Sequence, residues 1–344
     1  MVALRADTSP GSSRTAASEP AGRRRHLSDA AFVTLWPGET IGRYEIMSLL
    51  GCGALGPTYC ARDRTLGRDV VIKEFLPWML ALRPDGINVV AEPSSAAADL
   101  DWMRTRFVEE GARLRDLPPV PFVARAIDLL DANGTSCIVF NVVPGISLQQ
   151  RVRTGGIMRP ATVERLLSSL VEALSHLHGE GLLHGDIRPA NVMVDLIGRP
   201  TLIDFGNARA AMAQRLPGLA PPPPSGYAAP ELLRGEPASA ATDIYALAAT
   251  IHYAITGRAP PDAARRLQSD RYEPLAVAAP AGFAREMLAG IDRALTLHPG
   301  DRPQSIRVLR ALLRSRAGAR SGLASKSRFS RLWTAAAAAV TPRR

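Results

Sequence analysis

The segment from residue 184 to residue 206 constrains this chain most, because it sets three polar side chains at fixed spacings along a short stretch. A His-Gly-Asp sequence ends at Asp186, Asn191 follows five positions later, and Asp204 opens the sequence Asp-Phe-Gly. One carboxylate is suited to accept the proton of an attacking hydroxyl. The amide and the second carboxylate are hard oxygen ligands of the kind that hold Mg²⁺ against phosphates. The spacing therefore favours phosphoryl transfer.

A glycine-rich loop precedes this segment, with Gly51, Gly53 and Gly56 in the pattern G-x-G-x-x-G. A dinucleotide-binding turn would need a helix directly after the last glycine. The sequence continues instead with Pro-Thr-Tyr-Cys, which predicts a strand. The loop is therefore expected to turn a hairpin, where backbone N–H groups approach phosphates without obstruction by a Cβ atom.

Lys73 ends the apolar run Val-Val-Ile-Lys, 17 positions after Gly56 (73 − 56). An ammonium on an apolar strand is costly unless a phosphate or a carboxylate partners it. Glu110 is the preferred carboxylate and Glu109 is its alternative. A pairing with Glu110 spans 37 positions (110 − 73), which predicts an insertion at 77–105.

The chain changes character at 141–147. Before this point, strand-like runs and turn signals dominate, including a hairpin turn at Asn133-Gly134. After it, long segments have the spacing of amphipathic or buried helices. Two lobes are therefore expected, a small one rich in strands and a larger helical one.

The two ends are expected to be disordered tails, at 1–40 and 315–344. The first has no apolar stretch typical of a secretory signal. The second holds seven basic residues and no acid, a large share of the net charge of +10. Contact of this tail with an anionic surface is an alternative to plain solvation, and no specific nucleic-acid site is indicated. No run approaches the roughly 18 apolar residues that cross a membrane. Three cysteines suit a reducing cytoplasm.

In this order, the motifs resemble the eukaryotic-like, bacterial-type serine/threonine protein kinase family over roughly 43–314. The sequences Gly-Tyr-Ala-Ala-Pro-Glu at 226–231, Thr-Asp-Ile-Tyr-Ala-Leu at 242–247 and Asp-Arg-Pro at 301–303 extend the resemblance through the second half. It implies an α+β, bilobal fold, with a β-rich N-lobe at 41–143 that carries one key helix and a mainly helical C-lobe at 144–314.

The resemblance also implies ATP and Mg²⁺ as cofactors, with Mn²⁺ as a second possibility, and protein serine or threonine hydroxyls as acceptors. Asp186 becomes the catalytic base, and Asn191 and Asp204 become the metal ligands. The residues implied to assist the phosphates are Lys73, Glu110 and Arg188. Those implied to hold the nucleotide are Gly51, Gly53, Gly56, Thr58, Val71, Lys73, Phe140, Asn141, Val143 and Met193. Asp243 is implied to brace the catalytic loop, and Arg302 to pair with Glu231.

Two departures from the family pattern concern regulation. Gly185 replaces the arginine that in the family reads a phosphate on the activation loop, and 207–224 contain no Ser, Thr or Tyr. The phosphate acceptor and its reader are thus missing together, so control by activation-loop phosphorylation is not expected. A third departure is Pro224, which stands where a threonine usually contacts the catalytic aspartate; Ser225 is a possible substitute.

Two other functions use similar residues. A pseudokinase would bind partners without transferring phosphate, yet the lysine, the two aspartates and the asparagine are all present. A small-molecule phosphotransferase of the aminoglycoside or choline kinase type often contains His-Gly-Asp. Such enzymes lack the Ala-Pro-Glu and Asp-Arg-Pro sequences found here, so the protein kinase reading is preferred.

Overall fold

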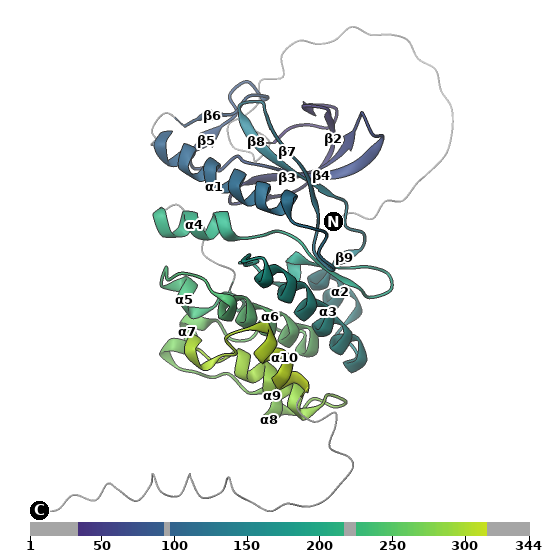
Figure 1. Cartoon of the computed structure of the whole chain (residues 1–344), viewed down its shortest axis with the longest axis vertical. Coiled ribbons are helices and arrows are strands. Elements are labelled where there is room, and N and C mark those ends of the chain that lie inside the picture. Colours follow the sequence, from purple (N-terminus) through teal and green to yellow (C-terminus); the bar gives the residue numbers. More distant parts are fainter. Residues whose placement is uncertain (1–33, 93–96, 217–224, 315–344) are drawn as a thin grey trace, which may run out of the picture.

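The computed structural model describes residues 34–92, 97–216 and 225–314. Figure 1 shows two lobes, one built around a twisted sheet and one built from helices. This arrangement confirms the expected α+β, bilobal fold. Of the expected tails at 1–40 and 315–344, residues 1–33 and all of 315–344 lie outside the described residues.

The N-lobe contains an antiparallel sheet in the order β1-β2-β3-β4-β8-β7, a two-stranded β5-β6 hairpin and one long helix. Helix α1 packs against β7 and β8. The bounds are β1 Thr40–Ile41, β2 Tyr44–Gly53, β3 Gly56–Asp63, β4 Arg68–Glu74, β5 Ala81–Leu82, β6 Val90–Ala91, α1 Ala97–Asp116, β7 Ala126–Ala132 and β8 Thr135–Asn141.

The C-lobe begins with a small sheet in the order β11-β10-β9 and continues with helices. Its elements are β9 Ile146–Ser147, α2 Leu148–Gly155, α3 Pro160–Gly179, η2 Pro189–Asn191, β10 Val192–Val194, β11 Pro200–Leu202, α4 Asn207–Arg215, α5 Pro230–Leu233, α6 Ala240–Thr256, α7 Ala263–Gln268, α8 Leu275–Ala278, α9 Arg285–Ala294, η3 Pro299–Asp301 and α10 Ile306–Arg314.

Alternation along β4 directs Lys73 toward the C-lobe. Val70 and Ile72 are fully buried in a cluster of N-lobe residues on one face of the sheet. Val71 lies on the other face and packs against the main core, the large hydrophobic cluster that continues into the C-lobe. Because successive strand residues point to opposite faces, Lys73 lies on the same side as Val71. Glu74 returns to the opposite side, where it forms a buried ion pair with Arg83.

The folded body starts before residue 41, which corrects the expected boundary of the N-terminal tail. Leu35 is buried, and its backbone N–H donates to the hydroxyl of Tyr59 over 3.0 Å. Thr40 pairs with Glu45 in the first two strands. A buried leucine and a strand partner give this stretch the contacts that a disordered tail lacks.

The hairpin expected at Asn133-Gly134 is present between β7 and β8. Both residues have positive φ angles, 51° and 73°, as a tight turn matching the twist of the strands requires. The expected insertion at 77–105 is shorter than predicted, because α1 already begins at Ala97. Its first part forms the β5-β6 hairpin.

Helix α6 is the centre of the C-lobe, and every residue from 241 to 255 is buried. A helix that is buried on all sides is stable only when other elements surround it. Helices α3, α9 and α10 all contact it. This buried helix carries Asp243, which contacts the His-Gly-Asp loop described below.

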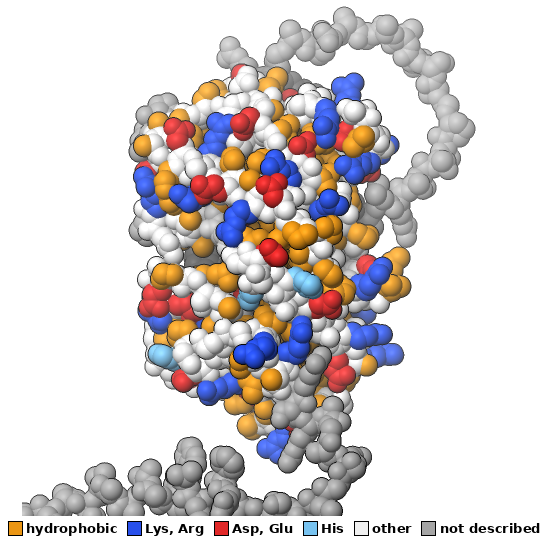
Figure 2. All heavy atoms as spheres, in the orientation of Figure 1, with side chains coloured by type: hydrophobic (Ala, Val, Ile, Leu, Met, Phe, Trp, Pro, Cys, Tyr) orange, Lys and Arg blue, Asp and Glu red, His pale blue; other side chains and the backbone are white. Residues whose placement is uncertain are grey.

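Basic and acidic side chains are interspersed over both lobes on the face shown in Figure 2. In the part of the chain that the structure describes, no helix has both the length and the apolar character needed to cross a membrane.

Candidate active site

Asp243 on α6 fixes the backbone of the His-Gly-Asp loop. Its two carboxylate oxygens accept the N–H groups of His184 and Gly185 over 2.8 and 2.9 Å, and His178 Nε2 lies 2.9 Å away. The carboxylate is buried, and buried acids persist where such partners compensate their desolvation. The bracing role expected for Asp243 is therefore confirmed.

His184 is fully buried and holds the loop from the inside. Its Nε2 lies 3.1 Å from the carbonyl oxygen of Ile203, which accepts only, so Nε2 carries the proton. Burial lowers the pKa of His184, which keeps the ring neutral. Its unprotonated Nδ1 accepts the N–H of Asp186 over 3.3 Å. The histidine thus joins the catalytic loop to the strand that leads into Asp204.

The Asp186 carboxylate has a partner on each oxygen. Asn191 Nδ2 donates to Oδ2 over 3.0 Å, and Arg188 Nε lies 3.4 Å from the same atom. Arg209, from helix α4, lies 2.8 Å from Oδ1. Asn191 and Arg188 are among the predicted site residues, whereas Arg209 was not predicted from the sequence.

Lys73 pairs with Asp204 rather than with a glutamate. The Nζ and Oδ1 atoms are 2.9 Å apart. Asp204 has a backbone φ of +62°, a value that residues other than glycine rarely adopt. Burial would raise the pKa of the Asp204 carboxyl, but the neighbouring Lys73 outweighs it and holds the pKa below its usual range. Two predicted residues of the nucleotide and metal site are thus in direct contact.

Glu110 and Glu109 have different surroundings. Glu109 lies on the outside of α1 and pairs with Arg106 over 2.7 Å. Glu110 accepts the backbone N–H of Ala208 over 3.0 Å. Burial raises the pKa of Glu110, although Lys73 is close enough to oppose that shift. Among the described ion pairs, the carboxylate on Lys73 is Asp204, so the expected direct pair with Glu110 is absent in this conformation.

Gly185 occupies a position where a side chain would be strained. Its φ is +76°, and an added Cβ would lie 3.1 Å from Asn207 Oδ1. Gly206 lies next to it as well, and a Cβ on Gly206 would lie 2.8 Å from the Gly185 carbonyl oxygen. The backbone conformation and the close neighbours at this position therefore favour glycine, whatever its role in regulation.

Substitution of Gly185 by alanine is expected to destabilise the chain by about 1–2 kcal/mol, the cost of left-handed backbone for a residue with a Cβ. Chemical denaturation measures the loss. Gly179→Ala is the control, since Gly179 has no neighbour within 4 Å of a new Cβ and no positive φ. Equal stability of the two variants would contradict the prediction.

The residues predicted to hold the nucleotide come from neighbouring strands. Thr58 pairs with Lys73, and Val71 pairs with Phe140. Val71 and Val143 pack against the main core, and Phe140 is buried within it. The glycine loop joins β2 and β3, where Gly53 pairs with Gly56. The remaining predicted members are Gly51 in β2, Asn141 at the end of β8 and Met193 in β10.

The glycine loop is attached to the end of β4 by its backbone. The N–H of Leu76 donates to the carbonyl oxygen of Leu55 over 2.7 Å. Gly56 has φ +135°, and an added Cβ would lie 2.2 Å from the Glu74 carbonyl oxygen. A residue larger than glycine would therefore push the loop away from the strand that carries Lys73.

Asn191 and Asp204 suit a divalent metal by the chemistry of their donor atoms. Asn191 is buried, and its amide nitrogen donates to both the carbonyl and the carboxylate of Asp186 over 3.0 Å. The amide oxygen is thereby turned away from Asp186, where it can serve as a ligand for a cation. An amide oxygen and a carboxylate match Mg²⁺, which keeps water for its remaining positions.

Among the described residues, the hydrogen-bond partner of Ser225 is Asp262 and not Asp186. The Ser225 hydroxyl hydrogen-bonds Asp262, as does the N–H of Gly226, and these bonds help hold the pKa of Asp262 below its usual range against the opposing effect of burial. The suggested replacement of the missing threonine by Ser225 is therefore not seen here. Pro224 lies outside the described residues.

Glu231 and Arg302 form a buried, bidentate ion pair. The two Nη–Oε distances are 2.7 and 2.9 Å. Arg302 also donates to three carbonyl oxygens, those of Thr296, Ala241 and Leu297. All five of its N–H donors are thus satisfied. The expected pairing is confirmed. It attaches helix α5, which carries Glu231, to the end of the C-lobe that carries Arg302.

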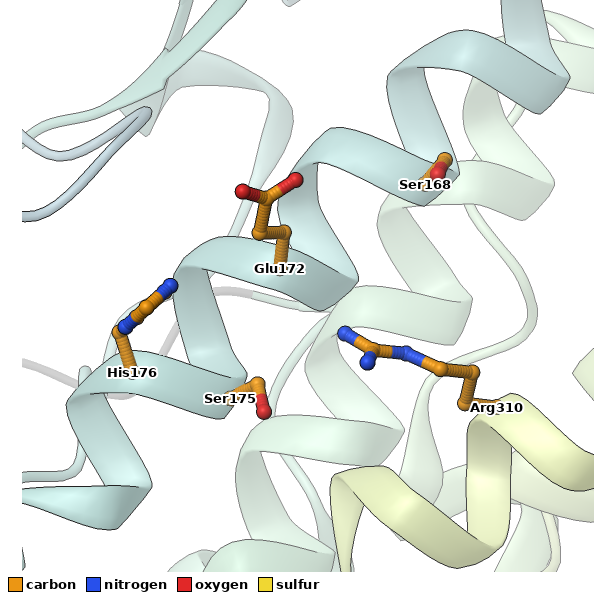
Figure 3. Close-up of a pocket in the computed structure, with 5 residues that line it drawn as sticks. All are labelled: Ser168, Glu172, Ser175, His176 and Arg310. Atoms are coloured by element: carbon orange, nitrogen blue, oxygen red, sulfur yellow. The ribbon is translucent and has the colours of Figure 1, made fainter.

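One pocket of about 410 Å³ lies elsewhere, between α3 and α10. Figure 3 shows Glu172 and His176 on one helix and Arg310 reaching toward them from the other. The remaining lining residues are Ser168 and Ser175. None of these residues belongs to the catalytic loop, so this pocket is separate from the site.

Comparisons with known proteins agree with this geometry. The sequence model of the protein kinase domain family matches residues 44–310. The serine/threonine-protein kinase PknB of Mycobacterium tuberculosis is 28% identical over 289 residues, which are 80% of this chain and 43% of that protein. PrkC of Bacillus subtilis is 30% identical over 222 residues, 64% of this chain and 31% of that protein. The chain thus spans less than half the length of these relatives.

Solved structures give the same result. The apo form of PpkA-294 has a TM-score of 0.72 and 32% identity, covering 82% of this chain and 99% of that one. Rad53 residues 1–466 share the fold at 19% identity, with a TM-score of 0.59 and coverage of 79% and 65%. Since the family match covers more than half of the chain and its motifs meet in one site, this chain belongs to the protein kinase family.

Proposed function

We propose that this chain transfers the γ-phosphoryl group of ATP to serine or threonine hydroxyls of proteins. The observation that carries the proposal is the meeting of Lys73, Asp186, Asn191 and Asp204, which come from separate segments of the sequence. Phosphoryl transfer depends mainly on positioning and on neutralising charge, and these residues offer both.

In this proposal, Asp186 accepts the proton of the attacking hydroxyl. Arg188 keeps its charge beside that carboxylate without a hydrogen bond from Nε, which leaves it able to turn toward a phosphate. Asn191 and Asp204 would hold Mg²⁺, or Mn²⁺ as another hard cation. When bound, the metal neutralises phosphate charge. Lys73 would contact the phosphates when nucleotide is bound, and Glu110, which lies close enough to Lys73 to affect its own pKa, would be its carboxylate partner.

The nucleotide is proposed to lie under the glycine loop of Gly51, Gly53 and Gly56. Its base would contact Thr58, Val71, Val143 and Met193, with Asn141 at the strand end and Phe140 behind it. The residue pairing between β3, β4 and β8 supports this grouping. We further propose a cytoplasmic location, supported by three free cysteines. Contact of the basic tail with an anionic surface remains a proposal about residues outside those described.

The direct test is incubation with γ-labelled ATP, Mg²⁺ and generic protein substrates, followed by identification of the phosphorylated amino acids. Phosphoserine or phosphothreonine is expected. Nucleotide binding without transfer would indicate a pseudokinase, and label on aminoglycosides or choline alone would indicate a small-molecule phosphotransferase. Either result overturns the proposal.

Control without activation-loop phosphorylation is part of the proposal. The loop sequence 207–224 has no hydroxyl acceptor, and Gly185 has no side chain to read a phosphate. Mapping of phosphosites on active protein is expected to find no essential site in 207–231. An essential phosphosite in that range would contradict this part of the proposal.

Glu110→Gln is expected to lower kcat/KM by about 10- to 100-fold, because it removes the charge of the proposed partner of Lys73. A hydrogen bond to a charged group contributes about 1.5–3 kcal/mol. Glu109→Gln is the matched control, since the neighbouring Glu109 pairs with Arg106 on the exposed side of α1. Steady-state kinetics decides between them. An equal loss in both variants would remove the proposed role of Glu110.

A further inference from the structure

Two buried charges lie directly behind the part of β4 that carries Lys73. Glu74 is the next residue of the strand, and its carboxylate forms an ion pair with the guanidinium of Arg83. Both side chains are 0% exposed. A buried ion pair contributes little net stability, because the loss of hydration offsets the attraction between the charges. The place of this pair beside Lys73 therefore points to a role other than net stability.

The Glu74 carboxylate is held at both of its oxygens. Arg83 contacts Oε1, and the hydroxyl of Tyr59 in β3 donates to Oε2 over 3.0 Å. The same hydroxyl accepts the backbone N–H of Leu35 over 3.0 Å. Glu74, Tyr59 and Leu35 are all buried. Because each oxygen has a partner of its own, the Glu74 side chain cannot rotate without breaking a buried contact, which is costly.

Arg83 belongs to the β5-β6 hairpin, which Figure 1 shows beside α1 in the N-lobe. Val89 of this hairpin packs with Leu76 and with Leu100 of α1. The N–H of Val89 also donates to the carbonyl oxygen of Asn133 over 2.8 Å. The hairpin is thus fixed both to α1 and to the turn between β7 and β8, so Arg83 reaches Glu74 from a fixed support.

The end of β4 that the ion pair holds also carries the glycine loop. Leu76 donates its N–H to the loop at Leu55, and Gly56 lies against the Glu74 carbonyl oxygen. Lys73 and Glu74 are joined by one peptide bond and point to opposite faces of the sheet. A displacement of Glu74 would therefore displace both Lys73 and the loop, the two elements proposed to meet the phosphates.

We propose that Glu74, Arg83 and Tyr59 are positioning residues, which set the places of Lys73 and the glycine loop for the phosphates of ATP. The inference rests on the proposed function, because it names what holds the nucleotide site in place. It gives the β5-β6 hairpin and the segment at Leu35 a part in nucleotide binding, through contacts on the face of the sheet opposite to Lys73.

The test measures equilibrium binding of MgATP and of adenosine, which lacks phosphates, by titration calorimetry. The double variant Glu74→Leu/Arg83→Met removes both charges at similar volume, so it is expected to fold while losing the positioning contacts. MgATP should bind about 10-fold more weakly, because contacts with the phosphates depend on placement within about 1 Å. Adenosine should bind as it does to the wild type. Tyr59→Phe removes a single hydroxyl and should weaken MgATP binding about 3-fold.

Arg62→Met/Asp69→Leu is the matched control. These residues form an ion pair between β3 and β4, the strands of Tyr59 and Glu74, but their side chains are 47% and 54% exposed. Removal of this exposed pair should change the affinity for neither ligand. Chemical denaturation of each variant checks that it is folded.

The outcomes separate this inference from the proposed function. An unchanged affinity for MgATP in the double variant, or equal losses for MgATP and adenosine, overturns the positioning role. If the double variant does not fold, the same criterion applies to Tyr59→Phe. Binding of MgATP by the wild type without phosphate transfer overturns the proposed function alone. Absence of MgATP binding by the wild type overturns both.

Discussion

Asp186→Asn is expected to lower phosphate transfer by about 10²- to 10⁴-fold, the usual contribution of a positioned general base. The substitution keeps the size of the side chain and removes its charge, so the hydroxyl proton loses its acceptor. Nucleotide binding should persist, because Lys73, Asp204 and the glycine loop are unchanged. The measurement is kcat with a protein substrate, together with the shift in melting temperature caused by MgATP.

Asp195→Asn is the matched control for this variant. Asp195 is a carboxylate in the turn between β10 and β11, where it accepts N–H groups of Ile197 and Arg199. It has no contact with Asp186, so its loss should leave kcat unchanged. Wild-type activity in Asp186→Asn would refute the assignment of the base. A complete loss of nucleotide binding would show instead that the variant disturbs the whole site.

Arg302→Met is expected to destabilise the chain by about 3–5 kcal/mol, because it leaves the buried carboxylate of Glu231 without its ionic partner. Methionine keeps much of the apolar volume but supplies none of the five donated hydrogen bonds. Chemical denaturation measures the loss. The double variant Glu231→Leu/Arg302→Met is expected to recover part of it, since removing both partners leaves no uncompensated charge.

Arg234→Met is the control for this prediction, since its ion pair with Glu236 is exposed and its removal should leave the melting temperature unchanged. Acid provides a second check. Burial acts to raise the pKa of Glu231, but the hydrogen bonds from Arg302 outweigh it and hold the pKa below its ordinary value of 4.5. The stabilisation is complete above pH 4.5 and disappears as the pH falls through the lower folded value. In Arg302→Met this acid-dependent loss should be absent.

The parts of the fold that sequence could predict are those fixed by local patterns. The turn at Asn133-Gly134 needs two residues that tolerate positive φ, and the sequence provides them. The catalytic loop could be placed because Asp186, Asn191 and Asp204 follow one another at spacings that few other folds require. Asp243 and the pair of Glu231 with Arg302 followed from short motifs in the same way.

Other parts depended on contacts that no local pattern reveals. Helix α4 could have been suspected from its run of alanine, arginine, methionine and glutamine, but its position between Glu110 and Asp186 is a tertiary property. The partner of Lys73 was misjudged for the same reason, since Asp204 and Glu110 are both near and α4 engages one of them. Arg83 is fully buried, contrary to what its charge suggests, because Glu74 is buried beside it.

The alternation along β4 has a consequence for insertions and deletions in the N-lobe. Lys73 and Glu74 are neighbours of opposite charge. Because side chains alternate along a strand, only their positions in that alternation decide which of them faces the nucleotide side. Removal of one residue from the strand before Lys73 would exchange the two faces. It would bury an ammonium in the apolar cluster around Ile72 and present a carboxylate to the phosphates. The number of residues in β4 before Lys73 thus determines the sign of the charge that the strand presents to a ligand.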